Sequence, residues 1–396
     1  MLRTGSVCMS FLYNSLTYES KEDESSTLLN KRCRKLRCLS DTLQNYGGVL
    51  SKISQMLSLD DHSSAVFSEC SPFQREKTID YFKEHMKNND HVDSVDFSVY
   101  KSGSVGQVHI ANYKGKKIVF KVQYVGIAKQ TQSDLDVLDK LTSYLYSFSD
   151  LENAMVNIKA QMYDELNYVS EVKNQQVVYE LYQDDEHIEI PKIIPELCSK
   201  DILSMYFVEG ESLDSFIKSS TQEEKNFIGI QMVRFIFKNI YVYGLLYADI
   251  HYGNFLIRDK SILCVLDFGC LQHLSKSLRI LLRRLHLSIK NKDKEEFYRV
   301  VEEMGIIDKT ISSKSKEYIY DYFCTQNEPW VSDDFEFTEE WLDMATEKDT
   351  ELMKEWTLPK DMVYFNKIPY GGYHVFTKLK LRGNFSALLD EIFDLE

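Results

Sequence analysis

Two short stretches decide the fold: YADIHYGN at residues 247–254 and LDFG at residues 266–269. Asp249 is followed five positions later by Asn254, and Asp267 begins an Asp-Phe-Gly triplet at the end of an apolar run. This is the spacing of a kinase catalytic loop and of the metal-binding motif that follows it. Carboxylate and amide oxygens are hard ligands that suit magnesium. The two stretches therefore predict phosphoryl-transfer chemistry on a kinase-like fold.

A glycine-containing loop and a strand lysine precede these motifs. Residues 94–126 alternate apolar and polar side chains around glycine-containing breaks, which predicts strand, loop, strand, turn and strand. Small loop residues let backbone N–H groups approach phosphate oxygens, and Lys121 on the third strand suits the α and β phosphates. The residues expected to bind ATP are Lys101, Ser102, Gly103, Ser104, Val105, Gly106, Gln107 and Lys121, with Tyr206, Phe207 and Val208 after a later strand.

Each of these segments also has an ordinary structural interpretation. A two-glycine hairpin is more often only a turn, and a lone strand lysine is usually a solvated one. Glu165 and Glu171 lie on a helix-compatible segment from about 132 to 182 and could hold Lys121 through an ion pair, but helical glutamates are normally surface residues. Chance rarely places all four segments in kinase order, so together they predict a site for ATP and Mg²⁺.

The pattern along the whole chain predicts an α+β, two-lobed, protein-kinase-like fold with a helical extension at its N-terminal side. The apolar run at 227–250 is interrupted by polar residues, which favours a buried helix over a membrane span, and only helical patterns follow residue 274. The expected parts are a flexible or targeting segment (1–40), the helical extension (41–92), a small sheet-plus-helix lobe (93–208) and a mainly helical lobe (209–396).

Composition and charge exclude some classes of protein. The 396 residues carry a formal charge of −14, from 61 acidic and 47 basic residues, so the surface should repel nucleic acid. Eight cysteines without a C-x-x-C pair favour a reduced, intracellular compartment. The opening residues match an organelle transit peptide weakly. A basic cluster at 31–37 is either a solvated helix face or a contact for anionic lipid headgroups, so a mitochondrial or membrane-peripheral location is compatible with the sequence.

From about residue 40 onward the chain resembles the UbiB-type atypical kinase family, whose eukaryotic members include mitochondrial proteins needed for coenzyme Q synthesis. The resemblance is strongest to the coenzyme Q branch. It rests on GGVLSKISQMLS, which is similar to the family's K-x-G-Q signature, and on SVGQVHIA, VFKVQYVGI, DELNYVSEVKNQ, YADIHYGNFLI, VLDFG and the closing YGGYHVFTKLKLRGNFSALLDE.

The resemblance implies roles for individual residues. Lys121 would contact the nucleotide and pair with Glu165, and Asp249 would act as the catalytic-loop aspartate. Asn254 and Asp267 would bind magnesium. The residues implied as regulatory are Lys52, Gln55 and Glu171, the first two on a helical extension that packs over the active site in the family. Taken by itself, that extension is an amphipathic helix with ordinary polar positions.

Three positions depart from the family pattern. Ser54 replaces the glycine of K-x-G-Q, and Asn167 replaces the aspartate of the family's E-x-D segment. In the phosphate loop, Lys101, Ser102 and Gly103 stand in place of an alanine run. Because glycine admits backbone conformations that alanine resists, we expect Gly103 to give tighter nucleotide binding, and Gly103→Ala to weaken it.

The segment after DFG separates this chain from conventional protein kinases. It passes into an apolar-periodic helix with no Ala-Pro-Glu, so the peptide platform is missing. The expected activity is ATP hydrolysis or phosphorylation of a small or lipid-like acceptor, with a quinone precursor, a membrane surface and biosynthetic-complex proteins as candidate partners. The alternatives are a nucleotide-binding pseudokinase scaffold and a kinase that phosphorylates other proteins.

Overall fold

The computed structural model describes residues 72–87, 91–103, 105–143, 159, 162–347, 352–357, 359, 365 and 368–395. The chain divides into two compact units. The first unit comprises Met1–Val172 and Ile193–Phe207, and the second comprises Lys173–Lys192 and Val208–Glu396. The division therefore falls at three places: inside the helix α7 (Tyr168–Tyr182), between Lys192 and Ile193, and between Phe207 and Val208.

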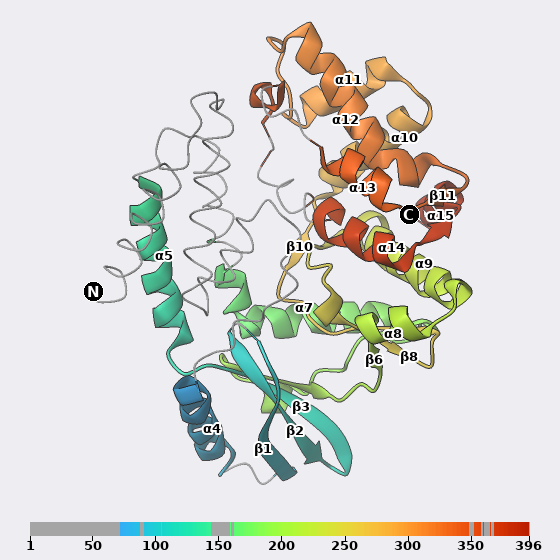
Figure 1. Ribbon diagram of the computed structural model, residues 1–396. Coiled ribbons are helices and arrows are strands. Elements are labelled where there is room, and N and C mark those ends of the chain that lie inside the picture. Colours follow the sequence, from blue (N-terminus) through green and yellow to red (C-terminus); the bar gives the residue numbers. More distant parts are fainter. Residues whose placement is uncertain are drawn as a thin grey trace, which may run out of the picture. The chain divides into compact units, whose positions relative to one another are not determined.

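A four-stranded antiparallel sheet forms the centre of the first unit (Figure 1). Its order is β1-β2-β3-β5, and the strands are β1 (Val92–Ser102), β2 (Gly106–Tyr113), β3 (Lys116–Gln123) and β5 (Ile202–Tyr206). Lys114 and Gly115 both have positive φ, 50° and 71°, which is the backbone of a tight two-residue hairpin turn. The strand, loop, strand, turn and strand order predicted from the alternating pattern is confirmed.

One face of this sheet is the core of the first unit. Phe82 of α4 (Pro72–Met86) is fully buried against Ile118, Phe120 and Val122 of β3. Because side chains alternate along a strand, the same strand turns Val119 and Lys121 to the other face. The core therefore fixes which face of the sheet carries the lysine.

Helices flank the sheet in sequence. The helix α5 (Ile127–Ser143) follows β3, and α7 precedes β5. The helix-compatible segment expected from 132 to 182 is thus helical at both of its ends. A short 3₁₀ turn, η1 (Pro195–Leu197), leads into β5 and places Leu197 in the same core as Phe82.

Short strands carry the chemistry-bearing loops of the second unit. A mixed sheet has the order β4-β9-β8-β6, with β4 (Ile188–Glu189), β9 (Ile262–Val265), β8 (Phe255–Arg258) and β6 (Glu211–Ser212). A second ladder pairs β7 (Leu245–Tyr247) with β10 (Leu271–His273). The YADIHYGN stretch joins β7 to β8, and LDFG joins β9 to β10.

The remaining described elements of the second unit are mainly helices around one apolar core. Thr221 and Glu224 form a capping box at the start of α9, exchanging hydrogen bonds with each other's backbone. The helices are α8 (Leu213–Ser219), α9 (Gln222–Lys238), α10 (Lys276–Lys290), α11 (Lys294–Glu303), α12 (Ser313–Val331), α13 (Glu339–Thr346), α14 (Tyr373–Leu379) and α15 (Phe385–Phe393), with a 3₁₀ turn η4 (Leu352–Glu355).

Two expectations for this unit are wrong. The run 227–250 is not one helix: α9 continues into a π turn, η2 (Asn239–Tyr243), and ends at Gly244, whose φ of 68° stops the helix before β7. Strands also occur after residue 274, because β11 (Phe335–Glu336) pairs with β12 (Arg382–Gly383). Two-residue strands far apart in sequence leave no period-two pattern, so the sequence does not reveal them.

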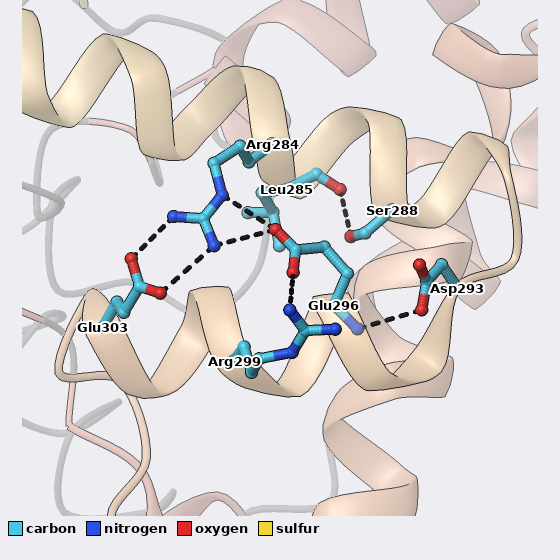
Figure 2. A network of polar contacts seen from close by, with 7 residues as sticks. All are labelled: Arg284, Leu285, Ser288, Asp293, Glu296, Arg299 and Glu303. Atoms are coloured by element: carbon cyan, nitrogen blue, oxygen red, sulfur yellow. Dashed lines mark hydrogen bonds and ion pairs between the residues drawn. The ribbon is translucent and has the colours of Figure 1, made fainter.

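Ion pairs join α10 to α11 (Figure 2). Arg284 of α10 contacts Glu296 at 2.8 Å and Glu303 at 2.6 Å, both on α11, and Arg299 contacts Glu296 at 2.9 Å. These side chains are half-exposed or exposed, so solvent screens each pair and its contribution to stability is small. The network aligns two helices and is not a candidate for chemistry.

Two further expectations concern membranes and thiols. Over the residues that the structure describes, every helix is too short or too polar to span a bilayer. The cysteines within this part of the chain, Cys198, Cys264, Cys270 and Cys324, are free thiols. Burial raises the pKa of Cys264 to about 12, so this thiol is not a reactive one.

Candidate functional site

Lys121 of β3 is held by a glutamate of α7. Its Nζ lies 2.8 Å from Oε1 and 3.0 Å from Oε2 of Glu171, and 5.0 Å from the centre of the Tyr168 ring. The Glu171 side chain is 2% exposed and that of Lys121 is 21% exposed. The ion pair is therefore largely shielded from solvent, and it fixes the position of the Lys121 ammonium group.

The partner of Lys121 in this contact is Glu171, one of the two glutamates that the sequence offered for the ion pair, and not the Glu165 that the family resemblance implied. Glu171 lies in the first turn of α7, on the helix that packs next to β3, whereas Glu165 is half-buried and precedes the start of α7. Asn167, between them, caps the helix: its Oδ1 accepts the Ser170 N–H at 3.0 Å. Asparagine serves as well as aspartate in that capping role.

The turn between β1 and β2 is closed by its own backbone. The Gly103 N–H donates to the Gly106 carbonyl at 2.8 Å, and the Tyr124 N–H donates to the Val105 carbonyl at 2.9 Å. A Cβ at Gly106 would lie 2.5 Å from the Val122 carbonyl oxygen, so only glycine fits there. Ser104 lies outside the described residues.

The expectation for Gly103 is wrong in its physical reason. Gly103 is not among the glycines with positive φ, and a Cβ there would meet only the Gly106 oxygen, at 3.6 Å. Alanine would therefore adopt the same backbone without strain. The conformational freedom expected of Gly103 is not used, and it is Gly106 that the loop requires.

Strand register places two of the predicted nucleotide residues in one row across the sheet. Lys101 of β1 lies opposite Val108 of β2, which lies opposite Lys121 of β3. The two lysines therefore share the face of the sheet that is opposite to the Phe82 core. Gln107, one residue from Val108, faces the core.

The Gln107 side chain takes part in a buried polar pair. Its Nε2 lies 2.9 Å from Nε2 of His109, and His109 Nδ1 lies 3.0 Å from the Ser98 carbonyl. Because a carbonyl only accepts, Nδ1 is the donor and the other ring nitrogen accepts from the amide. Burial lowers the pKa of His109. The Gln107 side chain is therefore used inside the sheet, and the nucleotide contact predicted for this loop, through backbone N–H groups, stays a prediction.

The end of β5 holds the other predicted nucleotide contacts. Tyr206 lies opposite Ile118 and packs against the Phe82 core, while the Phe207 N–H donates to the Lys117 carbonyl at 3.0 Å. The Lys117 Nζ lies 3.8 Å from the centre of the Phe207 ring. Val208 is the first residue of the second unit's longer segment.

Asn254 and Asp249 form a clamp within the second unit. The Asn254 Nδ2 donates to the Asp249 carbonyl at 3.0 Å and to the Asp249 Oδ2 at 2.6 Å. The amide nitrogen of Asn254 is therefore directed at Asp249, so the Oδ1 of Asn254 is turned the other way. His251 caps the intervening 3₁₀ turn, accepting the Gly253 N–H on Nδ1 at 3.1 Å.

Asp267 is brought next to this clamp by the β8–β9 hairpin. Phe255 pairs with Val265, and the Leu266 N–H donates to the Asn254 carbonyl at 3.0 Å. The Asp267 Oδ1 accepts the Gly269 N–H at 3.0 Å, which orients the carboxylate. The β8–β9 hairpin therefore brings Asp267 next to Asp249 and Asn254 within this unit, while the chemical roles of these residues stay predictions.

The donor atoms fit magnesium. Two carboxylates and one amide oxygen are hard ligands of the kind that this ion takes, with water and phosphate completing its shell. Within the described part of the chain no group of three or more His, Cys, Asp or Glu side chains gathers as a metal site. A zinc-type site is accordingly not found there, and an ion at Asn254 and Asp267 would depend on phosphate oxygens as well.

Tyr247 is a buried neighbour of Asp249 and Asp267 that was not predicted from the sequence. The Tyr247 hydroxyl is fully buried, and its pKa is raised by burial and then by the charges of Asp249 and Asp267. The signal was present, since Tyr247 directly precedes Ala248 and Asp249 in the deciding stretch. Lys52, Gln55 and Ser54 lie outside the described residues.

Comparisons with known proteins agree with these motifs. A family model described as the ABC1 atypical kinase-like domain matches residues 65–301. The mitochondrial atypical kinase COQ8 of Saccharomyces cerevisiae is 29% identical over 238 residues, which are 59% of this chain and 47% of that protein. The mitochondrial atypical kinase coq-8 of Caenorhabditis elegans is 24% identical over 379 residues, 89% of this chain and 50% of that one.

More distant similarities extend to chloroplasts and bacteria. The chloroplastic protein ACTIVITY OF BC1 COMPLEX KINASE 8 of Arabidopsis thaliana is 23% identical over 314 residues, 74% of this chain and 41% of that protein. The chain spans about half the length of the curated relatives it matches. The solved Rv3197–erythromycin complex from Mycobacterium tuberculosis aligns with a TM-score of 0.68 at 19% identity, covering 93% of this chain and 98% of that one.

At 19% identity the structural likeness shows the fold alone, and the matching family model describes that domain as kinase-like. The family model covers more than half of the chain and includes the phosphate loop, Lys121 and the Asp249–Asp267 region. The chain therefore belongs to the family of ABC1 atypical kinase-like domains, the UbiB family that includes the COQ8 proteins.

Proposed function

We propose that this protein binds Mg-ATP and uses it, as an atypical kinase or ATPase, in support of quinone-type lipid biosynthesis. The observation that carries the proposal is the clamp in which two oxygens of Asp249 accept from the Asn254 Nδ2, at 3.0 and 2.6 Å, beside the oriented carboxylate of Asp267. A clamp of this kind presets oxygen ligands before a nucleotide arrives.

Each residue has a chemical role in the proposal. Lys121, held by Glu171, offsets charge on the α and β phosphates. Asn254 and Asp267 hold the magnesium ion, which would neutralise charge developing on the phosphates. Asp249 accepts the proton of the attacking hydroxyl or water while it orients Asn254. The backbone of the loop closed by Gly106 lies against phosphate oxygens.

The segment after Asp267 favours a non-peptide acceptor. Gly269 is followed at once by β10 and then by α10, which begins at Lys276, so the chain returns to packed structure without a peptide-binding segment. Ala-Pro-Glu, which ends that segment in protein kinases, is missing from the sequence. A lipid-like or quinone-precursor acceptor, or water, is the proposed acceptor.

The link to quinones rests on relatives named COQ8 and on their mitochondrial location. We extend it to this chain as a proposal, together with a mitochondrial or membrane-peripheral site of action and partners in a biosynthetic complex. The competing proposal is a nucleotide-binding pseudokinase scaffold. It is favoured by Asn167, which supplies a neutral helix cap where the family has a carboxylate.

An ATPase assay separates the two proposals. Phosphate release is measured with and without lipid vesicles or phenolic quinone-precursor mimics, for the native chain and for Asp267→Asn. An active enzyme loses at least tenfold of its rate in the variant, because an ion ligand is lost. Equal release from both proteins identifies a scaffold. Labelled proteins in a lysate supplied with ATP would instead point to a kinase that acts on other proteins.

A further inference from the structure

A segment near the C-terminus packs against the backbone of the loop that carries Asp249, at a distance that leaves no room for a side chain on Gly371. Gly371, in the π turn η6 (Ile368–Gly372), lies against the backbone of Ile250, and a Cβ on Gly371 would be 2.5 Å from the Ile250 carbonyl oxygen. Atoms do not approach to that distance without a shift of backbone. Ile250 is the residue directly after Asp249.

Tyr252 of the catalytic loop contacts the next part of the same segment. Its hydroxyl donates to the His374 carbonyl at 3.2 Å, and the Lys378 Nζ lies 4.9 Å from the centre of its ring. Burial raises the pKa of Tyr252, so the hydroxyl stays protonated and remains a donor. Gly371, His374 and Lys378 thus contact the loop at two of its residues, on either side of His251.

The segment is itself anchored to the core of the second unit. The Tyr373 hydroxyl donates to the Gln326 carbonyl at 2.6 Å and accepts the indole N–H of Trp330 at 3.2 Å, both on α12. Phe376 is fully buried in the same aromatic cluster. A closely packed core deforms little, so these contacts fix the position of α14. The loop that follows Asp249 must therefore adapt to α14.

We propose that residues 371–378 are a positioning element for the catalytic loop, with Gly371 and Tyr252 as its positioning residues. This inference rests on the proposed function. The Ile250 carbonyl follows the Asp249 peptide, whose carbonyl and carboxylate hold the Asn254 amide. Moving Ile250 therefore turns the Asn254 Oδ1 away from the ion that it would bind.

The test compares two neighbouring glycines. Gly371→Ala forces a shift at the Ile250 carbonyl, whereas Gly372→Ala is the matched control, because its Cβ would meet only side-chain carbons at 3.4 Å or more. Calorimetry with the full chain measures the affinity for ADP without metal. It also measures the Mg²⁺ concentration at which the increase in ADP affinity caused by Mg²⁺ is half complete. Gly371→Ala should raise that Mg²⁺ concentration about tenfold or more and lower kcat by about 10- to 100-fold, with metal-free ADP affinity unchanged.

Tyr252→Phe provides a second, milder variant. It keeps the ring beneath Lys378 and removes only the hydrogen bond to His374, so kcat should fall about fivefold at unchanged metal-free ADP affinity. If Gly371→Ala does not fold, the kcat of Tyr252→Phe tests the inference instead. Equal Mg²⁺ requirement and kcat in Tyr252→Phe and the native chain, or in the two glycine variants, overturns the inference. If nucleotide binding to the native chain does not depend on Mg²⁺, the result instead contradicts the proposed function on which this inference rests.

Discussion

Glu171 holds the ammonium group of Lys121 with both carboxylate oxygens, at 2.8 and 3.0 Å, from the first turn of α7. Removing one partner of a buried pair leaves the other charge uncompensated, at a cost of about 3 kcal/mol. Glu171→Gln should therefore lower the free energy of unfolding and weaken ATP binding. Glu165→Gln, the matched control, should change both much less. Urea denaturation measures the stability and calorimetry measures ATP binding. A larger effect from Glu165→Gln than from Glu171→Gln would show that Glu171 is not the main partner of Lys121.

Substitution by alanine should be harmful at Gly106 and without effect at Gly103. A Cβ at Gly106 would lie 2.5 Å from the Val122 carbonyl oxygen and 2.9 Å from the Tyr168 hydroxyl, whereas a Cβ at Gly103 would make only an ordinary contact, 3.6 Å from the Gly106 oxygen. We expect Gly106→Ala to destabilise the fold by about 1–3 kcal/mol and to weaken nucleotide binding. Gly103→Ala should leave both within error. Loss of affinity in Gly103→Ala alone would show that the loop uses a different conformation when it binds ATP.

His286 of α10 should make the fold sensitive to acid. It is 3% exposed, and burial, with a smaller contribution from Lys290, lowers its pKa to about 4, while Asp390 acts in the opposite direction. The unfolded chain takes up the proton near pH 6.5 and the folded chain does not, so stability is full above pH 6.5 and falls as the pH drops toward 4. Between pH 7 and 5 the loss should be about 2 kcal/mol.

The control for this prediction is His286→Leu, which removes the titrating group and keeps an apolar contact with Phe393. Chemical denaturation of both proteins at pH 7 and pH 5 gives the difference that belongs to His286. If both proteins lose the same stability over that range, another group is responsible.

Much of the fold follows from local pattern in the sequence. The alternation in β1 and β2 and the glycine-containing breaks identify the first strands, because a strand with one buried face alternates. The third strand, β3, is instead recognised as a short apolar run. The spacing of Asp249 and Asn254 matches a turn in which the amide reaches back to the carboxylate. That turn is local, so the sequence alone predicts it.

The errors come from contacts that sequence does not encode locally. Glu165 and Glu171 are both acidic residues near α7, and only the start of that helix at Tyr168 decides which one reaches Lys121. Gly103 and Gly106 look equivalent until the neighbours of Gly106 are known. The helix predicted to residue 250 ends at Gly244 because tertiary pairing of β7 with β10 competes with helix formation.

Nucleotide calorimetry on the native chain, Lys121→Met and Asp267→Asn tests the central claim most directly. The account predicts that Mg²⁺ strengthens ADP and ATP binding to the native chain. Asp267→Asn should remove that enhancement and spare metal-free affinity, whereas Lys121→Met should weaken binding about tenfold or more with or without the ion. Nucleotide binding that is independent of Mg²⁺ in the native chain, or unchanged in both variants, would contradict it.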